Sequence, residues 1–102
     1  MDELKTFTKV KTISSREVAQ MMEVEHKNLL QKIDEINKDL VAENSATKYW
    51  TESLFENRGK KYREYQVTKR GCEFLAHKTT GTKGNLFTDR YMDKFEEMEK
   101  QL

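Results

Sequence analysis

Between Ser14 and Leu40 the apolar positions follow the period of an α-helix. Four aliphatic side chains recur at intervals of four, three and four residues, which places them on one helical face: Leu29, Ile33, Ile36 and Leu40. A shorter apolar group before them predicts a brief first helix: Val18, Ala19, Met21 and Met22. Ser14 and Glu17 form the S-x-x-E capping box that begins this helix. The break is expected at Glu23–Glu25, where neither Gly nor Pro marks it. This layout is typical of a helix-turn-helix, although αα-hairpins without a DNA-binding role share it.

Strand patterns flank the helix pair. Thr8–Ile13 alternates polar and apolar residues and predicts a short strand. Tyr49–Phe55 is rich in aromatic and β-forming residues, and Lys61–Val67 alternates again. Between them Glu56–Lys60 contains Gly59, which suits the positive φ of a tight turn. These segments predict a β-hairpin with a basic tip.

Two further helices are expected after the hairpin. Thr68 can cap a helix over residues 69–78, where Gly71 in the first turn costs about 1 kcal/mol relative to Ala and so requires a reason. Residues 79–82 form a connection, and a long last helix begins near Lys83 with a large apolar stripe: Phe87, Tyr91, Phe95, Met98 and Leu102. This stripe either closes the core or meets a second subunit. For a homodimer through this helix we expect contacts from Tyr91, Phe95, Met98 and Leu102.

The expected order is β-α-α-β-β-α-α, an α+β chain with a small antiparallel sheet and a long C-terminal helix. A strand before a helix-turn-helix and a hairpin after it form the winged helix-turn-helix arrangement. At 102 residues the chain fits a single domain, residues 1–102, in which residues 1–7 are expected to be flexible. The last helix either ends in a dimer or continues into a domain absent from this sequence.

Composition narrows the class of protein. The chain is 35% hydrophobic and 36% charged, has no apolar run long enough for a membrane span, and begins without the apolar region of a signal peptide. We therefore expect a cytoplasmic protein with no membrane partner. The lone Cys72 is expected to be a buried small hydrophobe. Two His and one Cys supply no metal-ligand set, and no nucleophile has a nearby base, so neither a cofactor nor an enzyme is predicted.

The distribution of charge is more informative than the net charge of +1. From Arg58 to Lys83 there are eight basic residues against two acidic ones. A basic middle in a near-neutral chain suggests a face that attracts phosphate, although a solvated Lys-rich surface has the same composition. Trp50 can stack on bases, but a single Trp is more often part of the core.

The candidate base contacts lie in the first turns of the second helix: His26, Lys27, Asn28, Gln31 and Lys32. Lys suits guanine, and Asn or Gln pairs bidentately with adenine. His26 has the alternative of capping the helix or packing against the turn.

The candidate backbone contacts are basic or hydroxyl side chains at the first helix and the hairpin: Ser15, Arg16, Arg58, Lys60, Lys61 and Arg63. Alternation along the second strand puts Arg63 on the same face as Tyr65 and Val67.

Five residue groups, in this order, resemble the phage regulatory protein Rha family: Ser15–Ala19, His26–Asn28 with Ile33, Tyr65 with Thr68–Gly71, Thr80–Lys83, and Phe95–Glu99. None of these motifs alone is specific for the family, but the five motifs in this order are. One departure is Gly84, because the family usually has Ala after the Thr-Gly-x-Lys motif.

The resemblance implies a small regulator encoded by a bacteriophage or prophage, which acts through double-stranded DNA in the bacterial host cell. Related phage modules serve in antirepressors. The alternative is therefore an antirepressor-like module that binds another phage or host regulatory protein.

Overall fold

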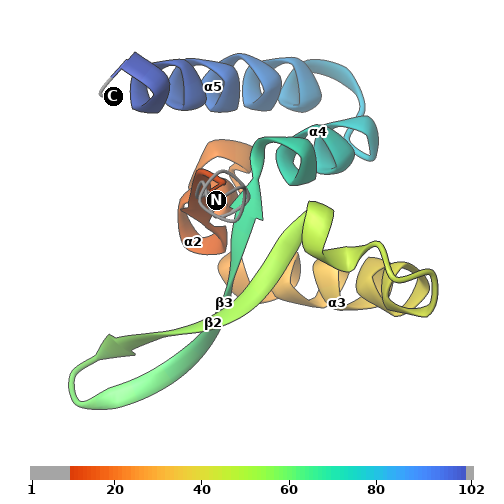
Figure 1. Cartoon of the computed structure of the whole chain (residues 1–102). Helices are drawn as coiled ribbons and strands as arrows, with labels where there is room; N and C mark the ends of the chain where they lie inside the picture. The colour runs from red at the N-terminus through yellow and green to blue at the C-terminus, as the bar shows by residue number, and fades with distance from the viewer. Residues whose placement is uncertain (1–9, 101–102) are drawn as a thin grey trace, which may run out of the picture.

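The computed structural model describes residues 10–100, which form a three-stranded antiparallel sheet and four α-helices (Figure 1). The elements in chain order are β1 (Thr12–Ser14), α2 (Ser15–Met22), α3 (His26–Ala42), the 3-10 turn η1 (Ala46–Lys48), β2 (Trp50–Asn57), β3 (Lys60–Thr68), α4 (Lys69–His77) and α5 (Gly81–Lys100). The predicted α+β class with a small antiparallel sheet is confirmed. β1 is shorter than the strand predicted over residues 8–13. Residues 1–9 lie outside the described part of the chain, and the prediction that residues 1–7 are flexible falls on these residues.

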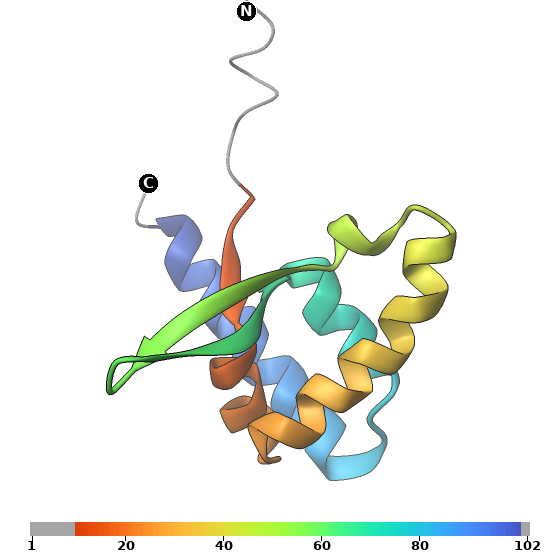
Figure 2. The same cartoon turned by 90° about the horizontal axis from the view of Figure 1, so that it is seen from below.

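The sheet has the order β1-β3-β2, and most of it is the β2-β3 hairpin. β1 pairs only with the root of β3, where Ile13 lies opposite Val67, while β2 and β3 remain paired out to Asn57 and Lys60. Figures 1 and 2 show the hairpin projecting away from the helices. At its tip Arg58 (φ 55°) and Gly59 (φ 79°) both have positive φ, as type I′ turns require, and this turn matches the twist of the strands.

The joint between α2 and α3 is stabilised by backbone and side-chain bonds in place of a glycine. Glu23 adopts the left-handed conformation (φ 61°, ψ 43°), and its N–H donates to Gln20 O at 3.1 Å. Arg90 of α5 lies 3.1 Å from the Glu23 carboxylate and donates to Met21 O at 2.6 Å. The predicted break at Glu23–Glu25 is confirmed, and α5 holds it in place.

At the start of α2, Ser14 Oγ accepts from the Glu17 N–H at 3.2 Å, so the predicted N-cap is confirmed. The Glu17 carboxylate lies 3.3 Å from Lys94 Nζ, so this side chain ties α2 to α5. α5 itself begins at Gly81 rather than near Lys83.

The core fills the space between the sheet root and the helices. Its largest fully buried side chains are Trp50, Tyr65, Phe87 and Phe95. Tyr91 and Phe95 are only 4% and 2% exposed. The expectation that these two meet a second subunit is corrected here, because both pack inside their own chain. Met98 is half-buried against the same core, and Leu102 lies outside the described residues.

Candidate nucleic-acid interface

The outer face of α3 carries the exposed polar residues that the sequence predicted as base contacts. Leu29 and Ile33 are buried on the inner face. The residues exposed on the outer face are Lys27, Asn28, Gln31 and Lys32. Three of these residues line a shallow hollow of about 510 Å³ on α3: Asn28, Gln31 and Lys32. The rest of the hollow is lined by Asp34, Glu35 and Lys38. Amide and ammonium groups on one exposed helical face can donate hydrogen bonds to base edges or phosphates.

His26 lies behind this face, at the junction of α2, α3 and the hairpin. It is half-buried, its Nε2 is 2.7 Å from Ser15 Oγ, and its ring meets the edge of Phe55 at 6.3 Å between centroids. Ser15 is fully buried, and its Oγ also accepts from the Tyr65 N–H at 3.0 Å. The expectation that Ser15 contacts the DNA backbone is therefore wrong: the hydroxyl is enclosed and joins three elements.

Replacing Ser15 with alanine is expected to lower the free energy of unfolding by about 1–3 kcal/mol, because the buried Tyr65 N–H loses its acceptor. Urea denaturation measures this loss. Ser14→Ala, which removes an N-cap bond on a half-buried side chain, is a neighbouring control with an expected cost of about 1 kcal/mol. An unchanged stability for Ser15→Ala would show that water replaces the hydroxyl.

Burial, and secondarily the charge of Arg16, lower the pKa of His26 below its ordinary value of 6.5. The unfolded chain therefore binds the proton more strongly than the folded chain. The stability that neutral His26 contributes is complete above pH 6.5 and is lost as the pH falls through the folded pKa. We expect the denaturation midpoint to fall as the pH is lowered through this window, and the His26→Gln variant to show a smaller fall. An NMR titration of the ring that gave a pKa above 6.5 would contradict this sign.

Arg16 of α2 packs against the middle of the hairpin and is partly neutralised. Its guanidinium carbon is 3.9 Å from the Phe55 ring centroid, and its Nε donates to Glu64 Oε1 at 3.1 Å. Glu64 is 3% exposed and also accepts from Ser53 and Gln66, each at 3.0 Å. About half of the Arg16 side chain stays exposed, so it can still approach an anion beside the hairpin.

Arg63 connects the hairpin to α3. Its Nη1 and Nη2 donate to the two carboxylate oxygens of Asp34 at 3.0 and 2.7 Å, and the Tyr65 hydroxyl donates to the same carboxylate at 2.7 Å. The bond from Arg63 lowers the pKa of Asp34. The expectation of Arg63 as a wing-tip phosphate contact is corrected, because it lies within β3 and its charge is already paired.

The hairpin tip presents the remaining predicted backbone contacts. Arg58, Lys60 and Lys61 are exposed and form no ion pair with another residue in the range 10–100. Just behind them Phe55 and Tyr62 stack across the strands at 5.5 Å between centroids, which stiffens the hairpin. α3 and the hairpin lie on the side of the molecule away from α5 (Figure 1).

Other candidate residues have structural roles. Trp50 is 2% exposed and its indole N–H donates to Asn37 Oδ1 at 2.9 Å, so it belongs to the core. Cys72 is buried as predicted, and burial raises the pKa of its thiol to about 12. Between residues 10 and 100, no group of His, Cys, Asp and Glu side chains is placed to hold a metal ion. No helix in that range is long and apolar enough to cross a bilayer.

Comparison with known proteins identifies relatives among phage proteins. The family model described as phage regulatory protein Rha matches residues 13–100. The "SPbeta prophage-derived putative antirepressor protein YoqD" of Bacillus subtilis (strain 168) is 40% identical over 92 residues, which make up 88% of this chain and 37% of that protein. The chain thus spans about 37% of that relative's length. No solved structure matches the chain significantly.

Proposed function

The chain belongs to the phage regulatory protein Rha family, and from this premise we propose that it is a sequence-specific regulator of transcription that binds double-stranded DNA. In this proposal the fold acts as a winged helix-turn-helix. α3 enters the major groove and the β2-β3 hairpin is the wing on the backbone. The protein works as a regulator rather than an enzyme, in the cytoplasm of the bacterial host.

The observation that carries the proposal is the fixed relation between α3 and the hairpin. Asp34 of α3 holds Arg63 bidentately and accepts from Tyr65 on the same strand. A polar helix face and a hairpin with three exposed cations are thereby held in one orientation. Phosphate contacts fix the register of a protein on duplex DNA, and base contacts read the sequence. A polar helix face held rigidly beside a basic hairpin can make the base contacts and the phosphate contacts at the same time.

Each side chain then has a distinct role. Lys27, Asn28, Gln31 and Lys32 face the base edges, with Asn28 and Gln31 suited to adenine. Arg58, Lys60, Lys61 and the exposed part of Arg16 contact phosphates. His26 lies too deep to be the first contact and positions the start of α3. Glu35 lines the same helix face, but its carboxylate repels phosphate, so it is not assigned a DNA contact.

Selection from random duplex oligonucleotides tests the proposal. We expect an enriched site, and a palindromic one if two copies bind together. On that site Asn28→Ala is expected to cost about 1–3 kcal/mol and to relax the preference at one position. Lys61→Ala is expected to weaken all duplexes alike and to lower the slope of log affinity against log salt by about 0.9. Glu43→Ala, at the C-terminal cap of α3, is a matched control away from the first turns.

A duplex affinity that did not depend on salt would sink the proposal. So would an Asn28→Ala variant that kept the full preference of the starting protein at every position, together with a Lys61→Ala variant that kept its salt slope.

The second candidate is an antirepressor-like module that binds another regulatory protein of the phage or host. The similarity to a relative named as an antirepressor favours it. Recovery of a repressor protein with purified chain, with no retardation of phage-derived duplexes in a gel, would favour this candidate over the first.

A further inference from the structure

A basic groove crosses the start of α4, on the side of the molecule that borders β1 and α5. One hollow there, of about 430 Å³, is lined by charged side chains and one apolar side chain: Lys11, Lys48, Lys69, Arg70, Glu99 and Val10. A second hollow of about 620 Å³ shares Lys69 and Arg70 with the first and extends to Glu73 and Met92. The two hollows therefore meet over the first turn of α4, and together they are called the α4 groove.

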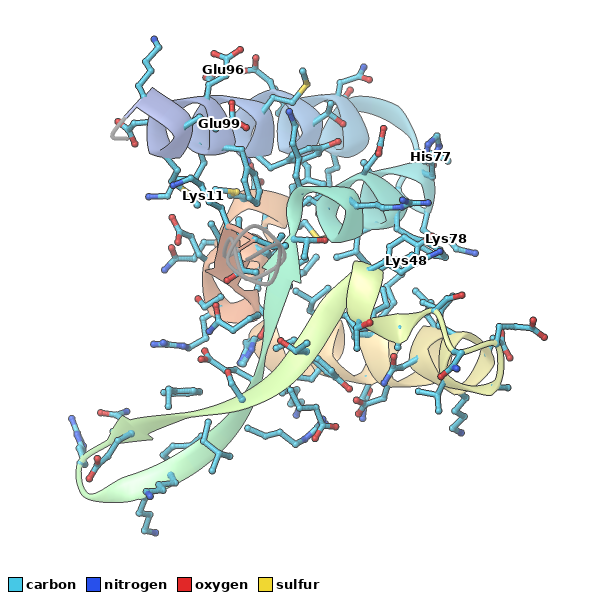
Figure 3. All side chains as sticks on the ribbon, in the orientation of Figure 1. Lys11, Lys48, His77, Lys78, Glu96 and Glu99 are labelled. Carbon is cyan, nitrogen blue, oxygen red and sulfur yellow. The ribbon has the colours of Figure 1, made fainter. Side chains whose placement is uncertain are left out.

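Four cations from three segments of the chain line the first hollow. Lys11 precedes β1 and Lys48 ends η1, while Lys69 and Arg70 begin α4. Figure 3 shows Lys11 and Lys48 on opposite sides of the segment that joins β3 to α4, with Glu99 on α5 near Lys11. Within residues 10–100, none of the four cations forms an ion pair. Because Glu99 is the one carboxylate in this lining, the hollow keeps an excess of positive charge.

The stability of α4 does not explain its two cations. The N-terminus of a helix carries a partial positive charge, so Lys69 and Arg70 are unfavourable in the first turn. That turn contains no acidic residue to offset them. An anion bound in the groove would remove this repulsion and would interact with both side chains.

Hydrogen bonds fix the backbone beneath the cations. The Thr68 N–H donates to Tyr49 O at 2.9 Å, and the Thr68 hydroxyl donates to Lys48 O at 2.8 Å. These bonds hold the end of η1 against the start of α4, and so keep Lys48 in the same hollow as Lys69. The Arg70 guanidinium carbon lies over the Tyr49 ring, 5.4 Å from its centroid. Groups that are already held in place lose less conformational entropy when they bind an anion.

We propose that the α4 groove binds an acidic segment of a partner protein. Carboxylates form charge-assisted hydrogen bonds with Lys and Arg. The groove also exposes apolar surface, because Val10 is 71% exposed in the first hollow and Met92 is 44% exposed in the second. A peptide can place apolar side chains there and keep its carboxylates away from Glu73 and Glu99. A nucleic acid carries a charge at every phosphate and is less suited to this mixture.

The α4 groove lies apart from the proposed DNA-binding surface. The groove borders α5, whereas α3 and the hairpin lie on the side away from α5 (Figure 1). In Figure 2 the first turn of α3 and the C-terminal end of α5 lie at opposite edges of the molecule. The chain can therefore hold an acidic peptide with or without a duplex. Peptide binding gives the second candidate function a surface, and it does not require that the chain binds DNA.

Selection from a library of random peptides, with the purified chain and no DNA, tests the proposal. We expect the enriched peptides to contain several Asp or Glu residues and at least one apolar residue. Exposed ion pairs are screened by salt, so their dissociation constants should rise about tenfold between about 50 and about 500 mM salt. A selection that enriched no peptide, or only peptides without acidic residues, would overturn the proposal.

Charge reversal in the groove tests the site itself. Lys69→Glu with Arg70→Glu places carboxylates in the first turn of α4, where the helix dipole favours them, so this variant is expected to fold. It should bind the selected peptides at least about tenfold more weakly. The matched control is Lys60→Glu with Lys61→Glu on the hairpin, which changes the net charge equally and should leave peptide binding intact.

Equal loss of peptide binding in the two variants would contradict the assignment to the α4 groove. All four substituted positions are exposed, and circular dichroism checks that each variant is folded. A duplex that displaced the peptides from the hairpin variant would show that the groove binds a phosphate backbone instead, which would also overturn the proposal. The two proposals fail separately, because the groove variant should still bind the selected duplex and the hairpin variant should still bind the peptides.

Discussion

Replacing Gly71 with alanine is expected to lower the free energy of unfolding by about 3 kcal/mol. Helix propensity alone predicts the opposite sign, because alanine is favoured over glycine in a helix interior by about 1 kcal/mol. The structure reverses that preference. A Cβ on Gly71 would collide with the backbone carbonyl oxygen of Tyr49 and would meet Val67 Cγ1 at 2.8 Å. A backbone atom held in the fold cannot move aside as a flexible side-chain end can.

The close approach at Gly71 has a clear structural cause. The Gly71 N–H donates to Thr68 Oγ1 at 3.0 Å, and that hydroxyl also lies 3.1 Å from Tyr49 O. The cap of α4 is thereby packed directly onto the start of β2. An added methyl group must separate α4 from the hairpin root, so the cap and the packing are lost together.

Urea denaturation of Gly71→Ala shows whether the substitution lowers or raises the free energy of unfolding. Glu73→Ala, on the exposed side of the same helix, is the matched control and is expected to change stability by less than about 0.5 kcal/mol. Gly59→Ala at the hairpin tip has open space around the new methyl group and pays only for its positive φ, about 1 kcal/mol. A Gly71→Ala variant more stable than the starting protein would contradict the close contact.

Features that depend on neighbours in sequence were predictable. The caps by Ser14 and Thr68 each use a bond to the residue three positions on, and both form as expected. The period of Leu29 and Ile33 identified the buried side of α3, and the turn at Gly59 marked the hairpin. In each case the pattern and the contact lie within one turn or one hairpin, where local geometry decides the outcome.

The roles of the polar side chains depended on contacts between distant segments. Arg63 and Asp34 are 29 positions apart, and Arg16 and Glu64 are 48 apart. Nothing local to the hairpin separates Arg63, which is paired, from Lys61, which is exposed. The one available signal was the alternation that put Arg63 on the face of buried Tyr65. Ser15 was likewise predicted as an exposed hydroxyl, but it is buried beneath β3, where it accepts a bond from the Tyr65 N–H.

The buried stripe of α5 shows the same limit. Its period predicted an apolar face correctly, but a period does not say whether that face is covered by the same chain or by another. Here α2 and α4 cover it, and Phe87, Tyr91 and Phe95 are buried. The apolar pattern alone could not decide between the two.

Trp50→Ala is expected to have the largest effect of all, a loss of about 3–5 kcal/mol. Trp50 is 2% exposed at the point where β2, α3 and α4 meet. Its ring packs against Tyr65 at 6.4 Å and Phe74 at 5.9 Å between centroids, and its N–H donates to Asn37 of α3. Truncation removes the aromatic contacts and the bond that joins the hairpin root to α3, and it leaves a cavity that these elements cannot fill by small shifts.

Trp50→Phe separates packing from hydrogen bonding. It keeps most of the ring contacts and removes only the donor to Asn37, so the expected cost is about 1–2 kcal/mol. Denaturation is followed by circular dichroism, since the substitution removes the single Trp as a fluorescent probe. If the wing must be fixed relative to α3, Trp50→Phe should also weaken duplex binding, although residue 50 touches no DNA in the proposed complex. Equal stability of Trp50→Ala and Trp50→Phe would mean that the bond to Asn37, and not the ring, accounts for the effect.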